Sequence, residues 1–179
     1  FCRRLGYDDR ALEWEARAAT LRENIFKHLW NGKFFVHQFC IGHDGIDNLE
    51  SERMSLSLSY DINRGITDIE QSRLIIAEYI KRRKTTDNFA EWFTVDPPYE
   101  IFNSHKKGEY VNGAISPFTA GELAKAAFNS GYECYGWDII SRFIELVERD
   151  GDVYFLYYPD SRPQPEGCLL YTSDAADDK

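Results

Sequence analysis

The sequence is short of cysteine and methionine, and it lacks several motifs that would identify common enzyme chemistries. It contains one methionine and four cysteines, and no two cysteines form a CxxC pair. Disulfide frameworks and zinc sites need paired or regularly spaced cysteines, so we predict neither and expect small buried thiols. No glycine-rich phosphate loop and no GxSxG motif is present. The sequence therefore gives no support for phosphate-loop or serine-hydrolase chemistry.

The chain also has fewer basic than acidic side chains. The chain has 30 acidic and 21 basic side chains and a formal net charge of −9. Nucleic-acid binding requires a basic surface, so we predict no nucleic-acid partner. No apolar run approaches the roughly 20 residues of a membrane span, so we predict no membrane partner. The 43% of apolar residues suffices for a core in one domain or part of one.

Both ends of the chain look incomplete. It begins Phe1-Cys2-Arg3-Arg4 without methionine, so we expect the natural start to lie upstream. Residues 168–178, CLLYTSDAADD, match one reading frame of a common sequencing adapter, and we interpret 168–179 as a scar. The domain is then 1–167, with 27 acidic and 20 basic side chains. The compartment stays open; only the absence of a signal-peptide pattern in these residues favours the cytoplasm.

Hydrophobic periodicity predicts a mainly α fold with short β excursions. Helices are expected over 8–29, 51–63, 67–84, 119–131 and 133–149, and extended segments over 33–39 and 153–158. Residues 51–63 also alternate as a strand does, but a helix buried on all sides can carry serine at its contacts. Capping boxes are expected at Thr67 with Glu70 and at Thr119 with Glu122, with Phe118 stapled onto Leu123. Trp137 is interpreted as a core residue and Asp138 as a surface residue.

Two polar, aromatic loops are the candidate functional segments. The first contains Asp96-Pro97-Pro98-Tyr99, whose prolines forbid helix. The second contains Glu109, Tyr110 and Asn112 directly before the helix expected from Thr119. Exposed loops on a packed helical base commonly carry binding residues. His37 and His43 lack a matched set of carboxylates, so ordinary surface or strand roles are preferred, and we predict no metal and no cofactor.

Several stretches together resemble the six-hairpin glycosidase superfamily, whose fold is the (α/α)6 toroid. LWNGKFF at 29–35 is similar to the turn after an outer helix, and RMSLSLSY at 53–60 forms a second stretch. GEYVNGAISP at 108–117, followed by GELA at 121–124, resembles the Y-x-N-G-x-x-W-P loop before an inner helix. The similarity covers most of residues 10–167. Glycoside hydrolase family 63 offers a loose comparison for its final part.

The resemblance implies a carbohydrate substrate, a glycoside hydrolase in the full-length protein, and helical hairpins from an incomplete toroid. Such enzymes use two carboxyl groups, one as proton donor and one to activate water. It implies Glu109 and Asp96 as the catalytic pair. Substrate-binding roles fall to Tyr99, Tyr110 and Asn112, with Trp92 and Arg64 more distant. These 179 residues alone are expected to be inactive and marginally stable, because unpartnered helices would expose apolar surface.

Two departures from the superfamily pattern keep other functions open. Ser116 replaces the tryptophan that often precedes the proline of the loop, which removes a stacking platform for sugar. The segment 154–159 contains no carboxylate before Pro159, although the family 63 comparison implies a base there. A sugar epimerase or phosphorylase on the same fold is one alternative. A carbohydrate-binding helical module that has lost its catalytic pair is another, and Glu109 is then a solvated loop acid and Asp96 a turn residue.

Overall fold

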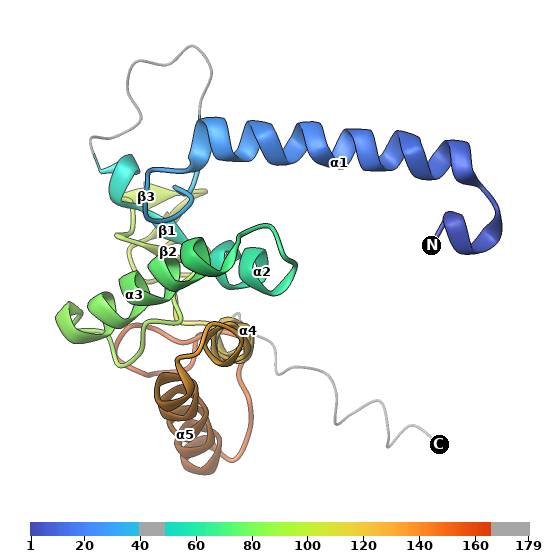
Figure 1. Ribbon diagram of the computed structural model, residues 1–179. Helices are drawn as coiled ribbons and strands as arrows, with labels where there is room; N and C mark the ends of the chain where they lie inside the picture. The colour runs from blue at the N-terminus through green and yellow to red at the C-terminus, as the bar shows by residue number, and fades with distance from the viewer. Residues whose placement is uncertain (40–48, 166–179) are drawn as a thin grey trace, which may run out of the picture.

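The structure, a computed structural model, describes residues 1–39 and 49–165 and confirms a mainly helical fold (Figure 1). The described helices are η1 (Arg3–Leu5), α1 (Asp8–Leu29), η2 (Glu50–Glu52), α2 (Ser57–Asn63), α3 (Ile69–Thr85), α4 (Pro117–Asn129) and α5 (Glu133–Asp150). Four two-residue strands form two antiparallel pairs, β1 (Met54–Ser55) with β2 (Val95–Asp96) and β3 (Ile101–Phe102) with β4 (His105–Lys106). His43 and the interpreted scar from 168 onward lie outside the described residues.

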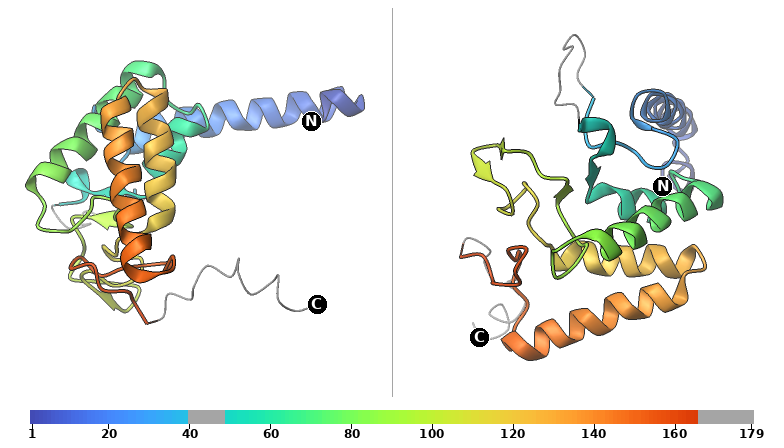
Figure 2. Two further views of the ribbon diagram at one scale, coloured as in Figure 1. Left: turned by 90° about the horizontal axis from the view of Figure 1, so that it is seen from below. Right: turned by 90° about the vertical axis from the view of Figure 1, so that its left-hand side faces the viewer.

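Helix α4 is the centre of the packed body and touches α2, α3 and α5. Its buried face is rich in small side chains, which allow neighbouring helices to approach closely. Helix α5 runs alongside it, as both views in Figure 2 show. Gly136 of α5 lies against Phe128 of α4, where an added Cβ would come within 2.9 Å of the ring. The sequence therefore favours this helix pair through a glycine on one side and an aromatic ring on the other.

The main hydrophobic core lies beneath α4 and includes the segment that leads into β2. Tyr79 of α3 stacks on Phe93, with ring centroids 5.6 Å apart. The fully buried side chains of this core include Leu58, Ile75, Ile76, Tyr79, Trp92, Ile115 and Leu123. Burial of each large apolar side chain contributes about 1.5–3 kcal/mol. This core fixes the base on which the loops before α4 rest.

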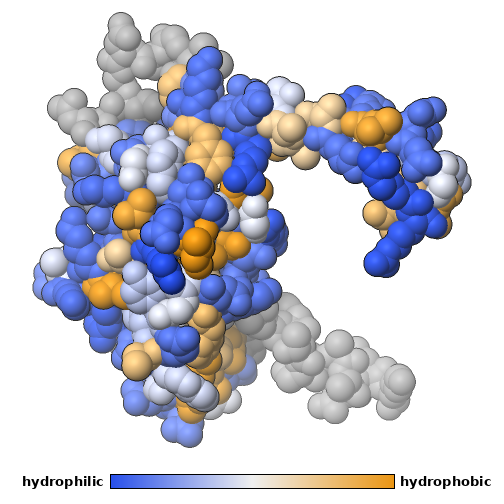
Figure 3. All heavy atoms as spheres, viewed as in Figure 1, coloured by the Kyte–Doolittle hydropathy of each residue, from blue (hydrophilic) through white to orange (hydrophobic). Residues whose placement is uncertain are grey.

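Helix α1 projects from this body, so most of its apolar stripe is not buried (Figure 1). Ala11 is the only buried residue of the helix, while Trp14 and Leu21 are 59% and 62% exposed. Apolar side chains are visible on this arm in the space-filling view (Figure 3). The prediction of an amphipathic helix is confirmed. Its apolar stripe, however, remains largely open in the described structure.

Neither predicted capping box forms, because α3 is capped one residue after the predicted position and α4 begins before it. Helix α3 is capped by Asp68 with Gln71, one residue after the predicted pair, and the Thr67 hydroxyl instead meets Ser72. Helix α4 begins at Pro117, which suits the first helical position. Ser116 precedes it in an extended conformation and donates its N–H to the carbonyl of Trp92.

As a result, Thr119 lies inside α4, where its buried hydroxyl has no hydrogen-bond partner among the described residues. Glu122 accepts a hydrogen bond from Asn63 of α2 rather than from its own helix start. Phe118 is 44% exposed and contacts Phe155 edge-on instead of stapling onto Leu123. The stop at Gly131 is confirmed by its left-handed φ of 82°.

The predicted extended segments contain single bridges rather than strands. In 33–39 the Asn31 side chain accepts the N–H groups of Lys33 and Phe34, which bends the chain into a turn. The one bridge in this region joins Trp30 to Phe35. In 153–158 Tyr157 bridges to Ile115 and to Pro163, so the loop is fastened to the segment before α4.

The predicted helix over 51–63 is only half correct. Strand β1 occupies Met54–Ser55 and pairs with Val95–Asp96, while α2 starts at Ser57. Trp137 was predicted to be in the core, but it is 61% exposed and contacts Phe128 at its edge. Asp138 is exposed, as predicted. None of the helices in the described ranges has both the length and the hydrophobicity that a membrane span requires.

Candidate functional site

A tight turn at residues 109–112 forms the centre of the candidate site. The Asn112 N–H donates to the Glu109 carbonyl over 2.7 Å, and the Gly108 N–H donates to the Asn112 carbonyl over 2.7 Å. The turn joins β4 to the segment that enters α4. Gly113 follows with a φ of 93°, and an added Cβ there would come within 2.9 Å of Pro98. Only glycine suits both the left-handed backbone and this close approach.

Tyr110 occupies the corner of the turn in a left-handed conformation, with a φ of 39°. Non-glycine residues rarely adopt this region, and they keep it only when the surroundings determine the backbone. Here the Tyr110 N–H donates to Gln164 and its carbonyl accepts the Thr94 hydroxyl, each over 3.0 Å. The residue as a whole is 42% exposed. The backbone is thus fixed while the aromatic face stays available to a ligand.

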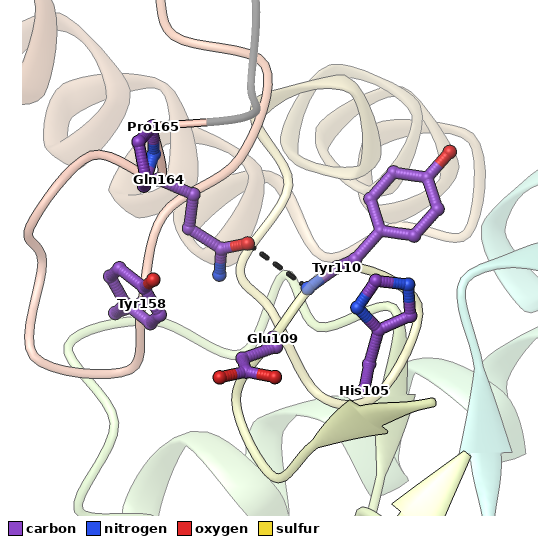
Figure 4. Close-up of a pocket in the computed structure, with 6 residues that line it drawn as sticks. All are labelled: His105, Glu109, Tyr110, Tyr158, Gln164 and Pro165. Carbon is purple, nitrogen blue, oxygen red and sulfur yellow. Dashed lines mark hydrogen bonds between the residues drawn. The ribbon is translucent and has the colours of Figure 1, made fainter. Parts of the chain in front are cut away.

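A cavity of about 120 Å³ opens beside this turn (Figure 4). It is lined by His105, Glu109, Tyr110, Tyr158, Gln164 and Pro165. The Glu109 carboxylate leaves the turn on the side of Tyr158, while the Tyr110 ring leaves it in another direction, near His105 (Figure 4). Typical small-molecule pockets are larger, about 300–1,000 Å³. The cavity has room for one polar edge of a ligand rather than for a whole oligosaccharide.

Glu109 is held by one strong hydrogen bond and is otherwise open to the cavity. Its Oε2 atom accepts the Lys106 N–H over 2.7 Å. The structure shows no ion pair for this carboxylate with any described residue. A partly buried carboxylate with unused lone pairs can accept hydrogen bonds from hydroxyl groups or exchange a proton. Glu109 therefore has the geometry of a ligand-facing group.

Gln164 and Asn112 are the buried amides that hold the turn in place. Gln164 donates to the carbonyls of Gly108 and Tyr157, over 2.7 and 3.1 Å, in addition to accepting the Tyr110 N–H. The side chain of Asn112, fully buried, accepts the Tyr99 N–H and donates to the carbonyls of Tyr99 and His105. Asn112 was predicted to bind substrate. Its polar atoms are instead occupied by the protein backbone.

Asp96 lies in a different cavity from Glu109. It forms an ion pair with Arg82 of α3, and it lines a space of about 320 Å³ together with Asn88, Lys107 and Gly108, among others. Because Gly108 directly precedes Glu109 in the chain, the two cavities lie close along the loop. The structure does not bring the two predicted catalytic carboxylates into one pocket.

The other predicted binding residues are also spread out. Tyr99 is 8% exposed and its hydroxyl faces Glu50 rather than the Glu109 cavity. Trp92 is fully buried, with the Arg142 guanidinium 5.1 Å from its ring, so it presents no surface to a ligand. Arg64 caps the C-terminal end of α2, where it lies over the Tyr60 ring. Only Glu109 and Tyr110 of the predicted set line the same cavity.

Four cavity residues were missed by sequence reasoning: His105, Tyr158, Gln164 and Pro165. Tyr158 belongs to the aromatic run that was assigned to an extended segment, and its place at the cavity follows from the bridge between Tyr157 and Ile115. The family 63 comparison did direct attention to this segment. The residue it brings to the cavity is a phenol and not a carboxylate.

No group of three or more His, Cys, Asp or Glu side chains within 1–39 and 49–165 is arranged to hold a metal ion. No family model matches the chain, and no curated protein matches it. The resemblance to the six-hairpin superfamily therefore stays a prediction from the three sequence motifs.

Proposed function

We propose that the protein acts on carbohydrate as a six-hairpin glycoside hydrolase, with Glu109 supplying one of the two carboxyl groups. The observation that carries the proposal is the turn at 109–112, which presents a partly buried, unpaired carboxylate and an exposed aromatic ring from adjacent residues. Sugars are recognised by this combination, since aromatic faces pack on their apolar C–H surfaces and carboxylates accept their hydroxyl protons.

In this proposal Glu109 exchanges a proton during cleavage of a glycosidic bond. The general acid protonates the departing glycosidic oxygen, and the second carboxylate removes a proton from the attacking water. Tyr110 positions the sugar ring, and the backbone contacts to Thr94 and Gln164 hold Tyr110 in place. Asp96 serves as the second carboxylate only if a ligand displaces its ion pair with Arg82 and the two separate cavities join.

Hydrolysis of a panel of aryl glycosides and disaccharides by the full-length protein tests this proposal. Glu109→Gln keeps an oxygen that can accept the Lys106 N–H, so the turn is retained while proton exchange is lost. We expect turnover to fall by at least about 100-fold, as for the removal of a general acid or base. Glu100→Gln is the matched control, because Glu100 is an exposed loop carboxylate outside the cavity. Unchanged turnover in Glu109→Gln contradicts the proposal.

A carbohydrate-binding module without turnover is the second candidate function. The ion pair of Asp96 and its separate cavity favour it, because they leave Glu109 without a second carboxylate in its own pocket. Calorimetry with the same disaccharides separates the two functions. Binding that Tyr110→Ala weakens and Tyr110→Phe retains, with no hydrolysis by any variant, supports the binding module.

A further inference from the structure

The cavity that contains Asp96 is larger than the one beside Glu109, with about 320 Å³ against about 120 Å³. It lies between the segment that follows α3, strand β2 and the start of the turn that carries Glu109. Its volume is at the lower end of the range for small-molecule sites, about 300–1,000 Å³. Its lining includes Thr86, Asn88, Asp96, Pro98, Lys107 and Pro159. The size suits one small ring rather than an oligosaccharide.

Close packing of the backbone fixes the walls of this cavity. An added Cβ on Gly108 would come within 2.8 Å of the Pro159 ring. One on Gly113 would come within 2.9 Å of Pro98. The Phe89 N–H donates to the Pro159 carbonyl over 3.0 Å, so the segment after α3 is joined to the same wall. Because the walls are already formed, a ligand does not have to order them when it binds.

Two polar side chains of the cavity have atoms without a partner. Asn88 is half-buried and its backbone N–H donates to the Thr86 hydroxyl over 3.1 Å, but no described residue bonds to its side-chain amide. Asp96 has a side chain that is 20% exposed, and its Oδ2 atom is paired with Arg82. Its Oδ1 atom has no partner within 1–39 and 49–165. Since polar groups with little access to water are normally hydrogen-bonded, these atoms favour a polar occupant.

The charges around the cavity are balanced. Arg82 offsets Asp96, and the two other charged lining residues, Asp87 and Lys107, are exposed and have opposite signs. A charged ligand therefore gains no net attraction. The Asn88 amide can both donate and accept, and the free carboxylate oxygen accepts, which suits hydroxyl groups. The two proline rings supply apolar surface for the C–H groups of a ligand.

We propose that this cavity is a binding site for a single neutral sugar ring, whose hydroxyl groups bond to the Asn88 amide and to the Oδ1 atom of Asp96. The inference goes beyond the proposed function, because it needs neither Glu109 nor the cleavage of a bond. Asp96 keeps its ion pair with Arg82 in this complex, and only its other oxygen meets the sugar. Lys107 supplies a further donor on the exposed side, since its ion pair with the exposed Glu100 is weak.

Binding of glucose, mannose, galactose and xylose to the full-length protein, measured by saturation-transfer NMR titration, is the first test. Asn88→Ala removes the free amide but no hydrogen bond of the described structure, since the backbone N–H to Thr86 stays. We expect about fivefold weaker affinity for each sugar that the wild type binds. Asn24→Ala removes an exposed amide from α1 and should bind as the wild type does. Equal affinity of Asn88→Ala and the wild type overturns the inference.

Lys107→Met is the second test, because it keeps the length of the side chain and removes its ammonium donor. We expect about twofold to threefold weaker affinity. Lys106→Met is the matched control, since Lys106 is the neighbouring exposed lysine and does not line the cavity. If Asn88→Ala lacks a cooperative urea transition, Lys107→Met decides the matter. Affinity equal to that of Lys106→Met then refutes the site.

Cyclohexanol tests whether the polar atoms select the ligand. It has a six-membered ring like that of a hexopyranose but only one hydroxyl group. We expect the preferred sugar to bind at least about fivefold more tightly, because Asn88 and Asp96 would meet several hydroxyl groups instead of one. Equal affinity for the two ligands would mean that the polar atoms have no part in recognition, which contradicts the proposed site.

The outcomes separate this site from the proposed function. If Tyr110→Ala weakens sugar binding and Asn88→Ala does not, the sugar lies at the Glu109 turn, which refutes this inference and supports the proposed function. If the wild type binds none of the four sugars while Glu109→Gln loses hydrolysis, the inference is again the one refuted. If binding depends on Asn88 and Glu109→Gln hydrolyses as the wild type does, the proposed function is refuted and the sugar site stands.

Discussion

Glu91 and Glu109 both lie in the long segment between α3 and α4, but their carboxylates have different surroundings. Glu91 is fully buried and accepts two hydrogen bonds from Arg142 and one, of 2.6 Å, from the Tyr135 hydroxyl. Glu109 accepts one backbone N–H and otherwise faces a cavity. A carboxylate whose lone pairs are all used by protein donors has a structural role, while one with unused lone pairs and access can meet a ligand.

The largest expected effect comes from removing the charge of Glu91. Arg142 is held at the Trp92 ring with only 15% of its side chain exposed. Glu91→Gln removes its buried ionised partner and leaves only the exposed Asp138 paired with this cation. We expect a loss of about 3 kcal/mol in the free energy of unfolding, as when one partner of a buried pair is removed. Urea denaturation at pH 7.5 measures it. Glu100→Gln, which removes an exposed loop carboxylate, should change stability by less than about 0.5 kcal/mol.

Asn112 lies on the buried side of the same turn as Glu109, and its loss comes next in size. Asn112→Ala leaves the N–H and C=O groups of Tyr99 without their side-chain partner. Unpaired buried polar groups are costly, so we expect a loss of about 2 kcal/mol, measured by urea denaturation. Asn129→Ala is the matched control, since its one hydrogen bond is exposed and 3.3 Å long. Equal stability of the two variants would show that the turn does not depend on Asn112.

Sequence reasoning selected Glu109 as a candidate, but it could not show which of the loop carboxylates are occupied by protein donors. Periodicity located α1, α3, α4 and α5 to within two residues at each end, because each has its own pattern of apolar positions. The cap of α4 was assigned to Thr119 instead of Ser116, because the conformation of Ser116 depends on its bond to the distant Trp92 carbonyl. The partners that distinguish Glu91 from Glu109, such as Arg142, are equally distant in sequence.

The burial of aromatic residues also could not be predicted from the local sequence. Trp92 and Trp137 look alike in the sequence, yet one is fully buried and the other is 61% exposed. Their burial depends on how α4, α5 and the segment before β2 meet, and no local pattern encodes that. The cavity beside Glu109 likewise combines His105 with Tyr158 and Gln164, which are more than 50 residues away along the chain. The folding of the segment after α5 onto the segment before α4 brings them together, and no sequence motif marks this contact.

Asp61 of α2 is an intermediate case between the two carboxylates. It is half-buried, whereas Glu91 is fully buried, and no described residue donates a hydrogen bond to its side chain. Burial raises the pKa of Asp61 to about 6, with the charge of Arg64 opposing the shift. Between about pH 4 and pH 6, Asp61 in the folded protein therefore still holds a proton, whereas in the unfolded chain, with a pKa near 3.9, it has released that proton. Stability from this group is present below about pH 4 and is lost as the pH rises to about 6.

Asp61→Asn removes this pH dependence. At pH 7.5 we expect a gain of about 1–2 kcal/mol, less than the full pKa shift would give because solvent screens the half-buried group, and at pH 4 we expect almost none. Thermal denaturation at both pH values gives the comparison. Asp87→Asn, at an exposed position before the core segment, should show no such difference. An equal gain at both pH values would mean that Asp61 is not protonated in the folded state at pH 4.

Glu109→Gln should have the smallest effect on stability. Its measurement tests whether Glu109, unlike Glu91, is dispensable for the fold. The Gln oxygen still accepts the Lys106 N–H, and no cation loses its partner. We expect the free energy of unfolding to change by less than about 0.5 kcal/mol, against about 3 kcal/mol for Glu91→Gln, in urea denaturation under the same conditions. A loss of 2 kcal/mol or more would place Glu109 with Glu91 as a structural carboxylate. A stable variant with lost turnover or sugar affinity would instead locate its role at the ligand, since the fold would be shown not to need its charge.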